Sequence, residues 1–400
     1  MDHDIAELKT AACAEVDRLG DQLISASHEI HAHPELNFAE HFAHDLLTNM
    51  LEQEGLSTQR HAYGVSTGFE ARAGEAGHDI AVLCEYDALP GIGHACGHNI
   101  IATAGLGAGL AAAVIARQAG GRIRILGTPA EEGGGGKIAM ARNGAFTGID
   151  AAMMVHPADA DLLYMNTVAL QELEVHFAGK AAHAAAAPWE GINALDGAVL
   201  GYMNIAALRQ HIRPTERVHG VFTKGGDKAN IVPSDAAMSW IIRSTTIETL
   251  QPLKDRVLAC LEGGARACGC TMSTQWNDVV YADMIDNGPM VQTYVDNAAA
   301  VGRTVYDPRA LGKAIVGSTD MGNVSYLVPS IHPMIQVAPE GVAIHTLDFA
   351  RWAASPDGDQ AVIDGAKIMA MTVIDLWCAP GLMESVQASF AQRPSGINVL

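Results

Sequence analysis

Five side chains of the kinds that bind divalent metal ions lie in four short segments of the sequence. They are Cys96, His98, Glu132, His156 and His345. The first two stand two residues apart in GHACGH, and the others follow at wide intervals. Thiolate, imidazole and carboxylate are the ligands that hold Zn²⁺ and its divalent neighbours, and five of them can serve two ions that share one bridging ligand. The sequence therefore indicates a dinuclear metal site.

A second acid, Glu131, directly precedes Glu132 in the segment TPAEEGGGGK. In a metal hydrolase two adjacent acids can divide the labour, because one binds the ion while the other takes a proton from water. A solvated pair of charges is the alternative interpretation. The pair comes straight after an apolar run at residues 122–126, however, and carboxylates placed there are costly unless a cation meets them.

Other interpretations of these segments exist. Cys96 and His98 alone could be a buried cysteine beside a histidine at a helix start. A cysteine nucleophile at Cys96 is possible in principle, but it leaves the acid pair and two histidines unexplained. A phosphate-binding loop at GGGGK is rejected, because Lys137 is followed by Ile138 and the required spacing is absent.

Composition restricts the class of protein. A chain of 400 residues exceeds what one hydrophobic core usually supports, so two domains are expected. The formal net charge of −20 argues against nucleic acid or an anionic membrane as a partner. Seven scattered cysteines argue against a disulfide framework and favour a reducing cytoplasm. The N-terminal segment has no secretory pattern, and the apolar run at 100–116 is shorter than the roughly 20 residues of a membrane span.

The elements that must position these side chains follow a βα pattern. Residues 5–56 have helical spacing with a turn at 31–36, and 100–116 is expected to be a buried helix. Short apolar strands are expected at 80–84, 122–126 and 151–155, and each ends in a polar cluster. We therefore expect an α/β catalytic domain with a mostly parallel sheet, helices on both faces and the site at the carboxyl edge.

The pattern changes near residue 169 to alternating strands around a helix at 193–211. This change indicates a smaller α+β lid or dimerisation domain at 169–283, with one face of its sheet exposed. The catalytic domain is then discontinuous and comprises 1–168 and 284–400. The apolar helix LDGAVLGYMNIAAL beside a strand edge predicts a homodimer through residues 169–283.

Several segments together resemble the M20 family of metallopeptidases and amidohydrolases. They are, in order, GHACGHN, TPAEEGGGGK, the isolated His156, FAGKAAHAAAAPWEGINALDG, GGDKANIVP and AIHTLDF. The resemblance covers nearly the whole chain. The segment GSTDMGNVSYLVPSIHP from residue 317, together with Asn99, is similar to the branch that contains aminobenzoyl-glutamate hydrolases and β-alanyl dipeptidases.

The resemblance implies a role for each ligand. Cys96 would bridge two divalent ions, with His98 and His156 completing one site and Glu132 and His345 the other. The thiolate favours zinc, while manganese, cobalt or nickel could also support activity.

The resemblance also implies roles for neighbouring acids. Glu131 would be the general base that activates the bridging water and later protonates the leaving amine. Asp87, in EYDALP, would support the metal site from behind the ligands. Glu85 departs from the Asp-x-Asp or His-x-Asp of the family, which puts a ligand role at that position in doubt.

Three residues of the insert complete the implied site. His183 would polarise the scissile carbonyl, often across a dimer interface, while Asn230 and Arg243 would hold the substrate, the arginine through the substrate carboxylate. A loop histidine and a surface salt bridge are the plain alternatives for His183 and Arg243.

The expected function is hydrolysis of an amide or peptide bond in a small carboxylate-bearing substrate, such as a dipeptide, an aminoacyl-glutamate or an N-acyl amino acid. Larger N-acyl or aromatic amides are a variant of this interpretation. A non-catalytic metal- or peptide-binding regulator that keeps the fold is the alternative.

Overall fold

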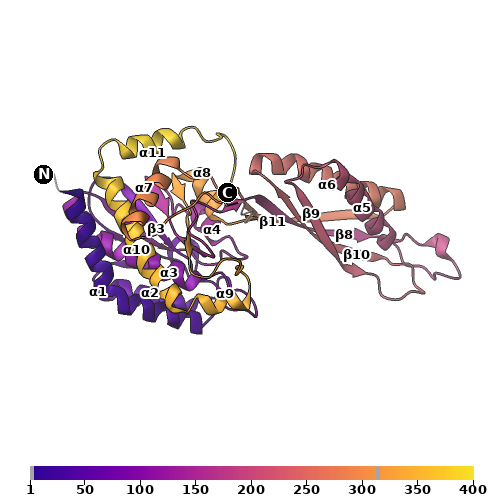
Figure 1. Ribbon diagram of the computed structural model, residues 1–400. Helices are drawn as coiled ribbons and strands as arrows, with labels where there is room; N and C mark the ends of the chain where they lie inside the picture. The colour runs from indigo at the N-terminus through magenta and orange to yellow at the C-terminus, as the bar shows by residue number, and fades with distance from the viewer. Residues whose placement is uncertain (1–3, 312–315) are drawn as a thin grey trace. The chain divides into compact units, whose positions relative to one another are not determined.

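The computed structural model describes residues 4–311 and 316–400, which form two compact units (Figure 1). One unit holds the chain up to residue 166 together with 284–396 and Leu400. The other holds residues 167–283 together with 397–399. All seven cysteines are free thiols.

A six-stranded sheet forms the centre of the first unit. In spatial order its strands are β1 (Thr58–Arg60), β2 (Phe69–Ala73), β4 (Arg122–Gly127), β3 (Asp79–Cys84), β5 (Ala151–Met153) and β13 (Ser330–Ile331). The pairs β4–β3, β3–β5 and β5–β13 are parallel, and β1 and β2 add an antiparallel edge. The sheet is therefore mostly parallel, as predicted.

Helices cover both faces of this sheet because β3 is apolar on both. Ile80 and Val82 join a core with helices α1 (Ile5–Ala32), α3 (His98–Ala119) and α10 (Pro356–Cys378). Ala81 and Leu83 point to the other face, as alternate residues of a strand do, and join a second core with α4 (Gly136–Arg142) and α8 (Met321–Leu327). The predicted α/β class with helices on both faces is confirmed.

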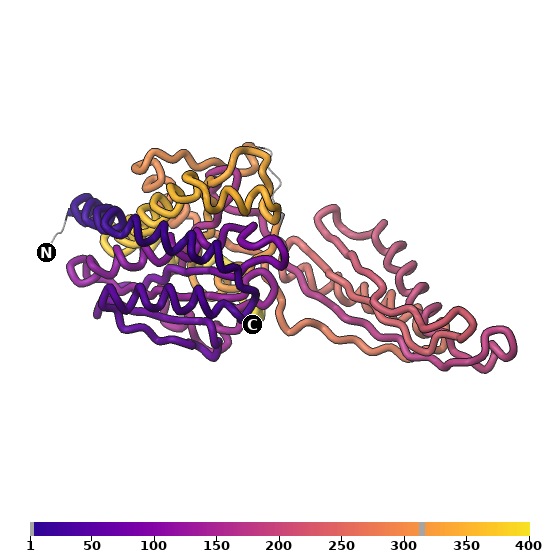
Figure 2. Tube along the Cα trace, turned by 90° about the horizontal axis from the view of Figure 1, so that it is seen from below, coloured from indigo at the N-terminus to yellow at the C-terminus, as the bar shows by residue number. Residues whose placement is uncertain are grey.

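Segments from opposite ends of the chain pack together on the first face. The indigo helix α1 and the yellow helix α10 lie beside α3 in both views (Figures 1 and 2). The remaining elements of this unit are α2 (His41–Gln53), η1 (Ala62–Gly64), β6 (His156–Ala158), β7 (Asn166–Thr167), α7 (Gly288–Ala300), β12 (Val316–Gly317), β14 (Met334–Gln336), α9 (Leu347–Trp352) and α11 (Leu382–Phe390).

Helix α3 is the apolar segment predicted to be buried. It is the one helix of the described chain that is long and apolar enough to cross a membrane, yet 89% of its most apolar window is buried inside the protein. Glycine lets it approach the sheet, since a Cβ at Gly105 would stand 2.5 Å from the carbonyl oxygen of Leu83. The helix is therefore a core element, and its first residue is His98.

The second unit is a four-stranded antiparallel sheet with two helices. In spatial order the strands are β11 (Thr271–Tyr281), β8 (Ala169–Ala178), β10 (Asp235–Ser244) and β9 (Arg217–Gly225). The helices are α5 (Ala194–Leu208) and α6 (Ile247–Cys268), and short 3₁₀ turns are η2 (Pro188–Glu190) and η3 (Arg209–His211). In β8, Leu173, Val175 and Phe177 are buried, while the residues between them are more exposed. This alternation matches the predicted α+β insert with one exposed sheet face.

Candidate functional site

The metal-binding types of side chain gather at the carboxyl ends of neighbouring parallel strands. The segment after β3 leads to Cys96 and to His98 at the start of α3, the segment after β4 carries Glu132, and the segment after β5 carries His156. Parallel strands end at the same edge of a sheet, which is where open α/β folds bind ligands. His345 lies in a loop at this edge. Its own backbone N–H donates to the carbonyl oxygen of Ala95 at 2.8 Å.

All five predicted ligands lie together, and Cys96 is common to two groups. The ligand atoms of Cys96, His98 and His156 lie within 4.8 Å of one another, as do those of Cys96, Glu132 and His345. Cys96 Sγ stands 3.3 Å from His156 Nε2, and His345 Nε2 stands 3.5 Å from Glu132 Oε2. Two sets of three side chains thus share one thiol.

The donor set fits divalent ions. Zinc bonds of about 2.0–2.3 Å in a tetrahedron place neighbouring ligand atoms roughly 3.5 Å apart, which agrees with the separations here. His98 Nε2 and Glu132 Oε1 are buried, and among the described residues neither has a hydrogen-bond partner. Buried polar atoms of this kind are costly unless something binds them, and a cation would do so.

The imidazole rings are oriented by hydrogen bonds on their far sides. His156 Nδ1 donates to the carbonyl of Pro157 at 2.8 Å, which leaves the lone pair of Nε2 facing Cys96. Burial and the nearby His98 lower the pKa of His156 to about 3, so this ring is neutral. A neutral imidazole with its second nitrogen anchored is the form that binds a metal.

Asp87 links two ligands at the back of the cluster. Its Oδ1 lies 3.1 Å from His98 Nδ1, and its Oδ2 accepts the backbone N–H of Glu132 at 2.9 Å. Burial acts to raise the pKa of Asp87, but the imidazole of His98 and the backbone N–H groups of Glu132 and Glu131 together outweigh it, and the net shift is downward. The structure therefore places Asp87 where it orients His98 Nε2 toward the cluster and holds the Glu132 backbone.

Backbone conformation also shapes the site. Gly97, between Cys96 and His98, has a φ of 78°, and a Cβ there would stand 2.8 Å from Pro157 Cγ. His345 and Ala130, the residue before Glu131, have φ of 62° and 59°, values that cost non-glycine residues about 1–3 kcal/mol. The N–H of Ala130 is held by a 2.9 Å hydrogen bond to the buried carboxylate of Glu40.

Glu131 is buried beside the ligands. Its Oε2 lies 3.9 Å from His98 Nε2, and only 8% of the residue is exposed. Burial, then the neighbouring carboxylates of Glu85 and Glu132, raise the pKa of Glu131 well above its usual range. A carboxyl group with this affinity for a proton can accept one during a reaction and release it again.

A buried ion cluster lies next to Glu131. The Lys137 ammonium is 2.5 Å from Glu85 Oε1 and 2.6 Å from Asp320 Oδ1, and all three side chains are fully buried. Burial alone would lower the pKa of Lys137, but the carboxylates of Asp320, Glu85 and Glu131 together outweigh it and raise that pKa. Glu85 Oε2 also stands 3.6 Å from His98 Nε2. The unusual acid at position 85 is therefore paired with a lysine.

The insert brings two of its three predicted site residues together. His183 forms an isolated β-bridge with Ile231, and the N–H of Ala184 donates to the carbonyl of Asn230 at 3.1 Å. Arg243 instead pairs with Leu170, at the end of the sheet where the chain enters the insert. The ladder from Leu170 to Ala178 spans about 26 Å at roughly 3.3 Å per residue. Arg243 and His183 are therefore at opposite ends of the insert sheet.

His183 has a defined tautomer. Its Nδ1 accepts the backbone N–H groups of Ala185 and Ala186 at 3.3 and 3.2 Å. The neutral ring then carries its proton on Nε2, and the residue is exposed. His183 therefore presents an N–H donor to whatever approaches this loop.

Comparison with known proteins identifies the family of this chain. The model of Peptidase family M20/M25/M40 matches residues 81–371, which include all five candidate ligands. The chain belongs to peptidase family M20. It is accordingly a metal-dependent hydrolase, because the peptidases of this family depend on metal ions.

Relatives of this M20 chain include enzymes of two specificities. A Xaa-Arg dipeptidase of Mus musculus is 39% identical, with 96% of this chain and 92% of that protein covered. One of the subunits of the p-aminobenzoyl-glutamate hydrolase of Escherichia coli (strain K12) is 29% identical, with 91% of each chain covered. Among solved structures, a Bacillus subtilis dinuclear metal binding peptidase from the M20 family has a TM-score of 0.70 at 19% identity, with 90% of this chain and 99% of that chain covered.

Three residues that shape this M20 site were not predicted from the sequence. Glu40, Lys137 and Asp320 were not among the predicted site residues, although each is fully buried. A signal existed for Lys137, since a lysine directly before the apolar run IAM must either be exposed or meet an acid. Its partner Asp320 lies 183 residues further along the chain, so no local pattern identifies it.

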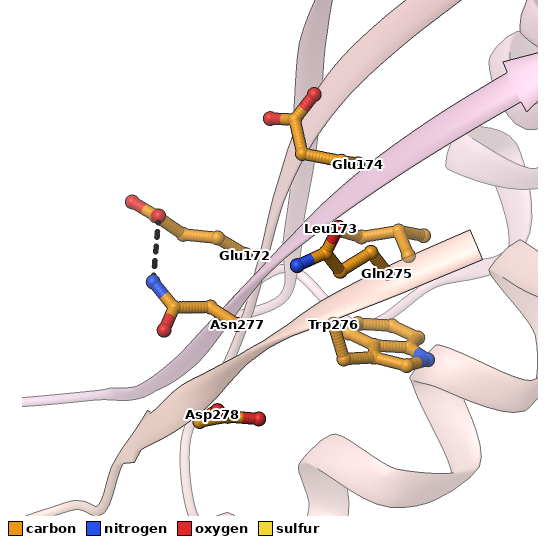
Figure 3. A pocket seen from close by; sticks show the side chains of 7 residues that line it. All are labelled: Glu172, Leu173, Glu174, Gln275, Trp276, Asn277 and Asp278. Atoms are coloured by element: carbon orange, nitrogen blue, oxygen red, sulfur yellow. Dashed lines mark hydrogen bonds between the residues drawn. The ribbon is translucent and has the colours of Figure 1, made fainter.

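A separate acidic hollow lies on the insert of the M20 chain. It is lined by Glu172, Leu173, Glu174 and residues 275–278 of β8 and β11, where the pairing of the two strands is irregular (Figure 3). Asn277 Nδ2 donates to Glu172 Oε2 at 3.1 Å across it. None of the predicted site residues lines this hollow, so it is distinct from the metal-ligand cluster.

Proposed function

We propose that this M20 hydrolase cleaves the amide bond of a small carboxylate-bearing substrate, in the first place a dipeptide, with two divalent ions. The observation that carries the proposal is the sharing of Cys96 by two ligand groups beside the buried acid Glu131. In this assignment His98 and His156 complete one ion site, and Glu132 and His345 complete the other. The thiolate favours zinc, and manganese, cobalt or nickel could replace it.

The chemistry divides between the ions and the protein. Two bound ions would lower the pKa of a water molecule and polarise the substrate carbonyl. Glu131 takes the proton of the attacking water and passes it to the departing amine. Asp87 keeps the His98 ring oriented while this happens, because it holds Nδ1 from behind. A neutral His156 stays available as a ligand throughout.

The insert is assigned the binding of the substrate ends. Arg243 binds the substrate carboxylate through its planar guanidinium, and Asn230 contributes a polar contact. The Nε2–H of His183 donates to the oxyanion that forms at the scissile carbonyl. A strand ladder of about 26 Å separates Arg243 from the His183 loop, and a dipeptide is far shorter than this. We therefore assign carboxylate binding by Arg243 and oxyanion stabilisation by His183 to two different chains of a dimer.

The second unit offers a surface for that dimer. Strand β9 is a sheet edge with mostly exposed side chains, including Val221 and Phe222. Helix α5 exposes Val199, Leu200 and Met203. Exposed apolar residues and an unpaired strand edge favour association of two copies. We expect light scattering to return twice 42.0 kDa, and a value of 42.0 kDa would remove the assigned role of His183.

Two further parts of the proposal concern substrate and location. The Xaa-Arg dipeptidase and aminobenzoyl-glutamate relatives make arginyl dipeptides and aminobenzoyl-glutamate the substrates to test first. Seven free cysteines support a reducing cytoplasmic location. A non-catalytic regulator is not favoured, because the ligand cluster and its neighbouring acid are all present.

The deciding experiment pairs hydrolysis with metal analysis. Glu131→Gln should keep the metal content of the wild type and lose about 10²- to 10⁴-fold in kcat, since the amide cannot accept a proton. Glu75→Gln, which changes an exposed acid outside the cluster, serves as the matched control. An active Glu131→Gln enzyme would overturn the assigned mechanism.

A further inference from the structure

An apolar pocket of the first unit is lined by segments that carry two of the candidate ligands. It has a volume of about 260 Å³ and is lined by Ala158, Asp159, Met334 and residues 341–344. Its lining segments run directly into two candidate ligands, because His156 lies two residues before Ala158 and His345 follows Ile344. The pocket is distinct from the acidic hollow of the insert.

Strand register places the pocket floor on the same face as a metal ligand. In the parallel ladder of β6 and β14, Met334 pairs with His156. Paired residues of neighbouring strands project to the same side, and so does a residue two positions along. Met334 and Ala158 accordingly share one small core cluster, whereas Ile335 belongs to the main core. The His156 ring and the pocket floor therefore face the same way.

The lining favours an apolar occupant over an acidic one. Alanine, methionine, valine and isoleucine side chains line the pocket, and its one charged group is Asp159. That carboxylate is fixed in place, since the N–H of Gly341 donates to its Oδ2 at 2.9 Å. A negative charge at this position disfavours an acidic side chain, while the apolar surface stabilises an aliphatic one.

We propose that this pocket receives an apolar side chain on the acyl side of the scissile bond. The inference rests on the proposed function, in which the carbonyl carbon lies over the ligand cluster and the insert holds the carboxylate of the leaving residue. The group attached to the carbonyl carbon then lies beside His156 and His345, the two ligands that the lining segments of the pocket carry. The substrate class that follows is a dipeptide whose first residue is aliphatic, such as leucine or methionine.

The test compares two dipeptides with the same leaving residue. Wild-type enzyme should cleave leucyl-arginine with a kcat/KM about tenfold or more above that of glycyl-arginine, as burial of one aliphatic side chain allows. Ala343→Phe, on the exposed wall of the pocket, should remove this preference by lowering the ratio of kcat/KM for leucyl-arginine to that for glycyl-arginine about tenfold. Ala76→Phe, at an exposed turn residue elsewhere, should change neither value.

A second variant, Met334→Ala, tests the pocket if Ala343→Phe does not fold. Met334→Ala enlarges the pocket floor and should shift the preference from leucyl toward phenylalanyl and tryptophanyl dipeptides. Metal content, measured in parallel, should stay at the wild-type value in both variants.

The outcomes separate the two proposals. The pocket assignment is overturned if both dipeptides are cleaved with equal kcat/KM in a chelator-sensitive reaction, or if the leucine preference survives both variants. Either result leaves the proposed function in place. Failure of metal-loaded wild type to cleave any arginyl dipeptide or aminobenzoyl-glutamate overturns the proposed function, and the pocket assignment fails with it.

Discussion

Two buried clusters of charge lie side by side at the carboxyl edge of the main sheet, and they are satisfied in different ways. In one, the Lys137 ammonium sits within 2.6 Å of an oxygen of both Glu85 and Asp320. In the other, His98 Nε2 and Glu132 Oε1 have no hydrogen-bond partner among the described residues. Burying charge is costly unless an opposite charge meets it. The first cluster carries its own cation, and the second has the donor chemistry to take cations from solution.

A third acid, Asp286, has neither kind of cation beside it. The residue is half-buried, and its Oδ1, which is itself buried, has no hydrogen-bond partner among the described residues. Burial raises the pKa of Asp286 to about 7, although the backbone N–H of His332 opposes this. A lysine, a proposed metal ion and a proton are thus three ways to neutralise an acid in one fold.

The largest effect is expected from the shared ligand. Cys96→Ser should lower the content of both ions and reduce kcat/KM by more than about 10³-fold, beyond the 10- to 100-fold typical of residues that only orient ligands. Elemental analysis and dipeptide hydrolysis measure the two effects. Cys378→Ser, a half-buried cysteine outside the cluster, should match the wild type. Retention of both ions in Cys96→Ser would show that the thiol is not shared.

Removing the Lys137 ammonium should instead lower the free energy of unfolding. Lys137→Met leaves two buried carboxylates without their ammonium, so we expect a loss of about 3–5 kcal/mol in the free energy of unfolding. Urea unfolding measures it. The double variant Lys137→Met with Glu85→Gln should recover part of that loss, because one of the stranded charges is gone. Equal stability of wild type and Lys137→Met would contradict the pairing described here.

A smaller effect is expected at Asp87, which lies behind the ligands His98 and Glu132. Asp87→Asn keeps the shape of the side chain but weakens its hold on the His98 ring, and we expect a 10- to 100-fold loss of metal affinity. Titration with a competing chelator gives this affinity. An Asp87→Asn protein that binds metal as tightly as the wild type would show that Asp87 does not orient His98.

The smallest effect is expected at Asp286, the acid that holds a proton. The folded chain keeps the Asp286 proton up to a pH near 7, whereas the unfolded chain releases it near 3.8, so this group makes stability fall as pH rises from about 4 to 7. Asp286→Asn should remove that fall and be more stable than wild type at pH 8. Thermal unfolding at pH 4 and pH 8 compares the two proteins. An equal pH dependence in both would show that Asp286 does not retain its proton.

The elements around the ligands could be predicted because their signals are local. Strand β3 is a short apolar run, and α3 begins at His98 in the segment that carries Cys96. Helix α6 and strand β11 were not identified. The buried residues Leu250, Leu253, Val257 and Leu261 recur at helical spacing, so the periodicity of α6 was sufficient to predict it, whereas β11 has no fully buried side chain and shows no clear alternation.

The supporting contacts of the site could not be predicted for a different reason. Glu40 holds the backbone of Ala130 from 90 residues away, and Lys137 meets Asp320 across 183 residues. Such pairs depend on the tertiary fold, and a single sequence contains no record of them. The ligand types could be found because their chemistry is rare, whereas a buried lysine or glutamate looks like a surface residue until the fold is known.

The proposed function depends on Cys96 serving two ions, while Glu85 is paired with Lys137. Anomalous X-ray diffraction from crystals of the zinc-loaded protein tests it most directly, since it locates each ion independently of activity. We expect two peaks, one on either side of Cys96 Sγ: one toward His98 and His156 and one toward Glu132 and His345. A single peak, or an ion bound by Glu85 and Glu131, would contradict it.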